Sequence, residues 1–215
     1  DITAAQKIGD FAFAGSKITS VTFGEALNEI GENPFAGCEI ATYGKTETVT
    51  IKEGYDVETL VTDYSIGNGI YVEGGVIYKT AQNGGKILVS YPAADTATSY
   101  TVASGTVRIS ARAFENAKLN NVILSSELKA IGDKAFYGCK KLSTVVFTSY
   151  NAPSLEEEFD SSYMTTANTP SSANGGLGIT GFYMWNVSSR NSNYFYGANF
   201  VDYIGKIKSD IVMVK

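Results

Sequence analysis

The side chains of this sequence that could do chemistry are few, and their types exclude several mechanisms. The 215 residues contain two cysteines, Cys38 and Cys139, and no histidine. Without an imidazole the chain can form neither a Ser-His-Asp triad nor a Cys-His dyad, and it offers no histidine ligand to a metal ion. We therefore expect no catalytic centre, no metal site and no cofactor.

The densest group of ionisable side chains is an acidic run, formed by Glu156, Glu157, Glu158 and Asp160. Carboxylates alone can bind calcium or carry out glycoside hydrolysis. The chain has no D-x-[DN]-x-[DN]-G loop to support calcium, and charge runs of this kind usually lie in solvent. We interpret the run as part of a solvated connection, which leaves enzymatic activity as the weakest hypothesis.

Tyrosines offer a second chemistry, the stacking of sugar rings. Four of them lie in a Gly-rich and β-branched stretch of the chain: Tyr71, Tyr78, Tyr91 and Tyr100. Tyrosines at alternating strand positions usually pack in a core or across strands. A carbohydrate-binding module that uses these rings is therefore the alternative function, and a glycan the alternative partner.

Charge and hydropathy exclude two classes of partner. The net charge is −5, so the chain gains little from a phosphate backbone, and we expect no nucleic acid partner. Its apolar runs, such as "TVVF", are too short to cross a bilayer, so we expect no membrane insertion in this segment. Charged residues make up 18% of the chain, and uncharged polar residues with many tyrosines are common in secreted proteins.

The elements that position these residues follow from a repeat. Four copies of one phrase occur: "IGDFAFAGSKI" at 8–18, "IGENPFAGCEI" at 30–40, "ISARAFENAKL" at 109–119 and "IGDKAFYGCKKL" at 131–142. The first two start 22 residues apart, and so do the last two. Downstream of each phrase the apolar residues follow L-x-x-L-x-L spacing, as in Leu119, Val122 and Leu124. A period of 20 to 29 residues with this spacing is a leucine-rich-repeat signature.

Each repeat is predicted to form one coil of a solenoid, because a single repeat cannot bury its apolar row alone. We predict that the repeat phenylalanines fill the corners of the coils, where Gly31 and Gly132 turn the chain. These phenylalanines are Phe13, Phe35, Phe114 and Phe136. Cys38 and Cys139 hold equivalent positions in coils that are not adjacent, so we predict two unpaired packing residues.

The phrases "IGENPFAGC" and "IGDKAFYGC" resemble the BspA-like leucine-rich-repeat family of bacterial cell-surface proteins. That family has a repeat close to I-G-x-x-A-F-x-G-C-x-x-L, and the resemblance covers residues 8–43 and 100–150. It implies a secreted or cell-surface location and a binding role. The chain departs from the pattern at Pro34, and at Gly24 and Ser125, where the family has a proline after the strand.

The sequence predicts a β-rich leucine-rich-repeat solenoid, a short right-handed horseshoe, with a C-terminal strand-helix cap. Residues 1–152 would form the solenoid, with degenerate hairpin-rich coils at 44–99 that turn at "GNG", "EGG" and "QNGG". Ile87 is 22 residues before Ile109 and would hold the equivalent position. Residues 153–215 would form a polar connection and a cap continuous with the solenoid, with a strand at 180–187 and a helix at 192–207.

Strand alternation gives the candidate contact residues. The residues predicted to point outward from the sheet strands are Ser20, Thr22, Asn121, Ile123, Thr144 and Val146. The function we expect is protein–protein interaction or adhesion. The partner would be a protein ligand, such as a host or neighbouring-cell surface protein.

Overall fold

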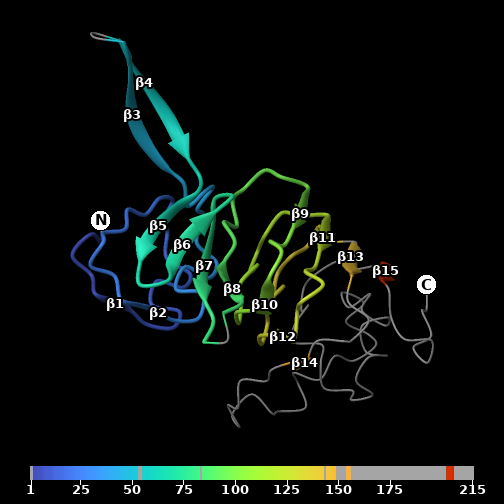
Figure 1. Cartoon of the computed structure of the whole chain (residues 1–215). Helices are drawn as coiled ribbons and strands as arrows, with labels where there is room; N and C mark the ends of the chain where they lie inside the picture. Colours follow the sequence, from blue (N-terminus) through green and yellow to red (C-terminus); the bar gives the residue numbers. More distant parts are fainter. Residues whose placement is uncertain are drawn as a thin grey trace.

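The computed structural model of the chain describes residues 2–52, 55–82, 84–142 and 144–148, together with two strands at 154–155 and 202–205. Within these residues the chain forms strands joined by tight corners, with no helix. Successive coils stack side by side, so that two sheets form opposite walls of a solenoid (Figure 1). The predicted solenoid is confirmed.

The first wall is a mixed sheet of seven strands. They are β5 (Tyr64–Gly67), β6 (Ile70–Glu73), β7 (Val76–Thr80), β8 (Lys86–Ser90), β10 (Thr106–Ile109), β12 (Ala130–Ile131) and β14 (Ser154–Leu155). Their order is β14-β12-β10-β8-β7-β6-β5. From β8 to β14 the strands run parallel, one from each coil, while β5, β6 and β7 are joined as antiparallel hairpins.

The second wall is a parallel sheet of four strands. They are β9 (Ser99–Thr101), β11 (Asn121–Ile123), β13 (Thr144–Phe147) and β15 (Asp202–Gly205). Strand β15 pairs with β13 over four residues, within the range 192–207 that the sequence predicted as helix. The helix is therefore wrong at these positions, because pairing with the open edge of β13 satisfies the backbone as a strand. The predicted strand at 180–187 lies outside the described residues.

Stacked aromatic rings fill the coil corners. The rings of Phe114 and Phe136 are 4.8 Å apart between centroids and nearly parallel, and both side chains are fully buried. Phe13 and Phe35 stack in the same way at 5.5 Å. Phe35 is buried, whereas Phe13, in the first coil, is only partly buried. The predicted burial is therefore confirmed for three rings and wrong for Phe13, which has a neighbouring coil on one side only.

Two repeat positions need a small or permissive residue, for different reasons. The glycine two residues after the phenylalanine makes the turn: Gly37 and Gly138 have φ of 71° and 72°, and Asn116 takes a similar angle at the same position. Gly31 and Gly132 do not make the turn, which corrects the expectation above. They allow close approach, since a Cβ at Gly132 would lie only 2.3–2.7 Å from backbone atoms of Ser110 and Ala111, well inside van der Waals contact.

Carboxylates link the corners of successive coils. Asp10 accepts a hydrogen bond from the Glu32 backbone N–H at 2.7 Å. In the same way Glu32 accepts from the backbone N–H of Ala111 at 2.7 Å, and it also pairs with Arg108 at 2.8 Å. The corner at 30–40 therefore stacks directly on the corner at 109–119, although Glu32 and Ala111 are 79 residues apart in the sequence.

The three turns predicted within residues 44–99 are confirmed, but one strand pairing differs from the prediction by one residue. The β5–β6 and β6–β7 hairpins turn through two residues with positive φ each, as type I′ turns require, and β7 joins β8 through 81–85. Ile109 pairs with Leu88 rather than Ile87, because the pairing of β10 with β8 contains an irregularity between Thr106 and Arg108. Leu88 is therefore the buried side chain, and a one-residue shift moves Ile87 to the other face.

Residues 45–61 differ from a coil. They form a long antiparallel hairpin of β3 (Lys45–Lys52) and β4 (Tyr55–Val61), which projects away from the solenoid (Figure 1). The first coils contain a separate parallel pair of strands, β1 (Lys7–Ile8) and β2 (Glu29–Ile30).

Candidate functional site

The four-stranded sheet holds four of the six candidate contact residues. Asn121 pairs with Thr144, and Ile123 pairs with Val146, in direct register across β11 and β13. Ile123 and Val146 are partly exposed, while the alternate residues Val122 and Val145 are fully buried. The predicted alternation is confirmed at these four positions, Val122, Ile123, Val145 and Val146.

The apolar pair lies within a longer row of strand partners. Thr101 of β9 pairs with Ile123 on one side, and Ile204 of β15 pairs with Val146 on the other. Parallel neighbours lie about 4.8 Å apart. The register therefore brings together Thr101, Ile123, Val146 and Ile204 as one row across the sheet.

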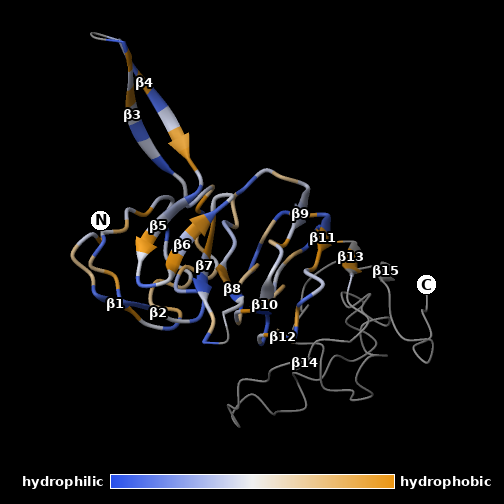
Figure 2. Cartoon of the chain, viewed as in Figure 1, coloured by the Kyte–Doolittle hydropathy of each residue, from blue (hydrophilic) through white to orange (hydrophobic). Residues whose placement is uncertain are grey.

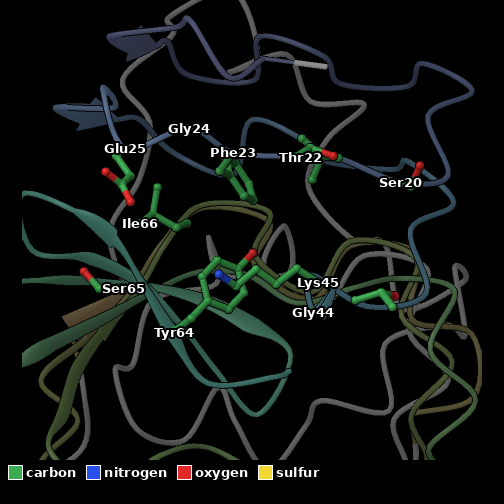
Figure 3. A pocket seen from close by; sticks show the side chains of 12 residues that line it. Ser20, Thr22, Phe23, Gly24, Glu25, Gly44, Lys45, Tyr64, Ser65 and Ile66 are labelled. Carbon is green, nitrogen blue, oxygen red and sulfur yellow. The ribbon is translucent and has the colours of Figure 1, made fainter. Parts of the chain in front are cut away.

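Ser20 and Thr22 are exposed as predicted, but they do not join this sheet. Phe23 beside them forms an isolated bridge with Ile2 instead. The two hydroxyl side chains line a groove of about 440 Å³, opposite Lys45 and Tyr64 (Figure 3). The structure thus divides the six candidates between two places, with four on the strands of the sheet and two in the groove.

The groove is lined by residues that sequence reasoning did not connect. Its lining residues come from three segments, at 20–25, 44–46 and 64–66. The Lys45 ammonium lies 4.7 Å from the centroid of the Tyr64 ring, and the Tyr64 hydroxyl donates to the Tyr43 carbonyl at 2.8 Å. Burial raises the pKa of Tyr64 to about 12. The arrangement offers hydroxyls, the rings of Phe23 and Tyr64, one ammonium and one carboxylate, Glu25, without a paired nucleophile and base.

The tyrosines proposed for sugar stacking belong to the core. Tyr78 is 0% exposed and Tyr91 is 3% exposed. The hydroxyls of Tyr78 and Tyr100 lie 2.8 Å apart, and burial raises the pKa of both. Tyr71 stacks on Tyr78 with 6.0 Å between ring centroids. Because the core covers the rings of Tyr78 and Tyr91, the stacking hypothesis is wrong for these two.

Both cysteines are free and buried, which confirms the prediction. Each thiol donates to the corner phenylalanine carbonyl 25 residues earlier: Cys38 to Phe13 at 3.1 Å and Cys139 to Phe114 at 2.9 Å. Burial raises the pKa of the Cys139 thiol. The thiols are therefore packing groups that hold adjacent coils together.

We expect thiol titration of the denatured, unreduced monomer to find two free thiols. In the native protein the same reagent is expected to react far more slowly, because both thiols are buried and the reactive species is the thiolate. Finding no free thiol, with a mass two hydrogens lower, would contradict the coil separation.

The described residues contain no group of three or more acidic or cysteine side chains placed to hold a metal ion. The acidic run at 156–160 lies outside them. A search of the described residues for a helix long and apolar enough to cross a membrane finds none.

The stacked coils, the corners that recur at a spacing of 22 residues and the exposed sheet face define a leucine-rich-repeat module. The chain belongs to the family described as the BspA type leucine rich repeat region, whose model matches six copies over residues 2–59 and 93–202. A comparison with curated protein sequences finds no match.

Three solved structures are similar to the chain. A leucine-rich cell surface protein from Faecalibacterium prausnitzii A2-165 has 18% identity and a TM-score of 0.45, over 70% of this chain and 48% of its own. A leucine-rich repeat protein from Eubacterium ventriosum ATCC 27560 has 28% identity and a TM-score of 0.40, over 68% and 47%. The pneumococcal vaccine antigen PcpA has 16% identity and a TM-score of 0.48, over 98% and 50%. The chain thus spans about half the length of these proteins.

Proposed function

We propose that the chain is a protein-binding module that acts in adhesion or protein–protein interaction, at the bacterial cell surface or after secretion. Its protein partner would be a host or neighbouring-cell surface protein. The family supports a binding role. The uncharged polar composition and the resemblance to bacterial surface proteins support the location.

The observation that carries the proposal is the in-register pair Ile123 and Val146 on the outer sheet face. Both side chains are β-branched, apolar and partly exposed, and the strand positions beside them hold Thr101, Asn121 and Thr144. An apolar centre beside uncharged polar residues has the composition of a protein contact patch, and the next strand adds Asp202 and Ile204 at the paired positions.

Binding is expected to require this pair. A panel of purified extracellular-matrix and surface proteins, beside a glycan array, would identify the partner. We expect the double substitution Ile123→Lys with Val146→Lys to weaken binding to that protein by at least about 100-fold, because two charges would have to be desolvated in the contact. Since Ile123 and Val146 carry no charge, and Asp202 is the one charged residue in the four described strands of this sheet, binding by the unmodified chain should depend only modestly on salt concentration.

The control places the same two charges on the groove of the first coil, with Ser20→Lys and Thr22→Lys. Circular dichroism would check that both variants remain folded. If the first variant binds at unchanged affinity, the pair merely suits an exposed strand, and loss in the control alone would move the contact to the groove. Binding to glycans but to no protein would contradict the proposed partner class.

A further inference from the structure

The first and second coils stack along one wall and at the corner, but they separate along the other wall. Strands β1 and β2 pair in parallel, and at the corner the Phe13 N–H donates to the Pro34 carbonyl at 2.7 Å. Beyond the corner, residues 20–25 and 44–46 are not paired as strands and line opposite sides of the groove of about 440 Å³ (Figure 3). The groove is therefore a gap between two coils whose ladder has opened.

The inserted hairpin explains why the ladder opens. Gly44 lies one 22-residue repeat after Thr22, at the position that would pair with the first coil. Its N–H donates instead to the Thr42 hydroxyl at 3.0 Å. The next residue, Lys45, pairs with Val61 at the base of the hairpin, which projects away with hydrophilic and hydrophobic residues mixed along its strands (Figure 2). The insertion thus directs the second coil away from the first.

The first coil keeps an open backbone edge along the groove. In later coils the ladder continues, because the Val102 N–H donates to the Ile123 carbonyl at 2.9 Å. The Leu124 N–H donates to the Val146 carbonyl in the same way, also at 2.9 Å. Phe23 holds the equivalent repeat position in the first coil. Its N–H has no hydrogen-bond partner among the residues that the structure describes.

Strand geometry gives the direction of the unpaired groups. The N–H and C=O of one residue point to the same side of a strand, and those of the next residue point to the opposite side. The Thr22 carbonyl accepts a hydrogen bond from the Ile2 N–H at 3.3 Å, so Thr22 directs its groups toward the N-terminal segment. Val21 and Phe23 therefore direct theirs into the groove, with a spacing of roughly 7 Å along the chain.

The side chains of the groove fit a peptide better than a sugar. Val21, Phe23 and Tyr64 are half-buried and offer apolar contact. The Lys45 ammonium covers one face of the Tyr64 ring, at 4.7 Å from its centroid, where a sugar would otherwise stack. Glu25 is exposed at one end of the lining segment and forms no ion pair with a described residue. An unpaired carboxylate there favours a basic group on the ligand.

We propose that the groove binds an extended segment of a protein, which adds to the first coil as a further strand. Backbone hydrogen bonds to Val21 and Phe23 would hold the segment, and recognition by strand addition to an open sheet edge uses the same bonds. Alternate side chains of the segment would contact Phe23 and Tyr64. A lysine or arginine of the segment would pair with Glu25.

Selection of displayed random octapeptides on the immobilised chain supplies the probe. We expect the enriched peptides to alternate apolar and polar residues and to carry a basic residue. At saturation, a selected peptide should slow amide hydrogen exchange at Val21 and Phe23 at least about tenfold, measured by NMR. The Thr22 amide points away from the groove and should exchange at an unchanged rate.

Methylation of the peptide backbone tests for strand pairing, because it removes N–H donors without changing the side chains. N-methyl groups on the alternate amides that face the Val21–Phe23 edge should weaken binding at least about tenfold. N-methyl groups on the intervening amides should have little effect. Equal losses from the two methylated series would overturn the proposal.

Charge reversal at Glu25 tests the preference for a basic residue. Glu25→Lys should weaken binding of the selected peptide about three- to tenfold. The control Glu39→Lys reverses an exposed charge outside the groove and should change nothing. Circular dichroism would confirm folding. Equal effects of the two reversals would contradict the role of Glu25.

The site is separate from the sheet-face pair, so the inference goes beyond the function proposed above and can fail independently of it. The Ile123→Lys with Val146→Lys variant should bind the selected peptide with unchanged affinity. Loss of peptide binding in that variant would overturn the groove proposal. A selection that yields no peptide able to protect the Val21 and Phe23 amides would overturn it as well.

Discussion

Replacing Phe136 with alanine is expected to lower the free energy of unfolding by about 3–5 kcal/mol, the usual cost of truncating a buried aromatic ring. Phe136 is fully buried and stacks on Phe114 at 4.8 Å. The cavity would lie between stacked coils, where the backbone hydrogen bond from Phe114 N–H to the Ala135 carbonyl, at 2.7 Å, resists collapse. Urea denaturation followed by circular dichroism would measure the loss.

The matched control is Phe13→Ala, at the same repeat position in the first coil. Phe13 is only partly buried and has its stacking partner, Phe35, on one side. Its truncation should therefore cost clearly less than that of Phe136. Equal losses at the two positions would show that ring stacking between coils does not determine the stability of the corner.

Gly132→Ala is expected to destabilise the fold by about 1–3 kcal/mol, the usual cost of overpacking a tight contact. The added methyl would overlap the backbone of Ser110 and Ala111. Backbone atoms cannot rotate aside as a side chain does, so the two coils would have to separate. The hydrogen bond from Gly132 N–H to the Ile109 carbonyl, at 2.8 Å, would be strained by that movement.

Gly9 provides the control, because it holds the same repeat position and a Cβ there meets nothing within 4 Å. Gly9→Ala should leave the midpoint of urea denaturation nearly unchanged. If Gly132→Ala were equally silent, the coils would be less closely packed at this corner than the structure describes. Both variants can be compared in one denaturation series with the wild-type chain.

The sequence alone was sufficient for those features that recur with the repeat. The spacing of isoleucine and phenylalanine predicted the corners, and strand alternation predicted that Val122 and Val145 face inward while Ile123 and Val146 face outward. The Gly-rich dipeptides predicted the hairpin turns. The hairpin turns depend on local backbone geometry alone. The corners and the strand faces depend also on contact with the next equivalent coil, which recurs with the 22-residue period.

Other features depend on which segments meet in space. The helical spacing of apolar residues at 192–207 gave the wrong element at 202–205, because the open edge of β13 takes up a strand there. The equivalence of Ile87 with Ile109 was off by one residue, because an irregular pairing of two strands is invisible in the spacing of either one. Ser20 and Thr22 matched the strand pattern yet line a groove, since β3 and β5 bring Lys45 and Tyr64 opposite them.

The repeat therefore determined the coil, its corner and the two sides of its strands, while the tertiary structure decided where the inserted block lies. The insertion leaves the corners at 30–40 and 109–119 in direct contact, through Glu32 and Ala111, and sends β3 and β4 outward as a hairpin. A periodic pattern encodes contacts between equivalent positions. An insertion has no equivalent position, so its place depends on the free energy of packing against the whole solenoid.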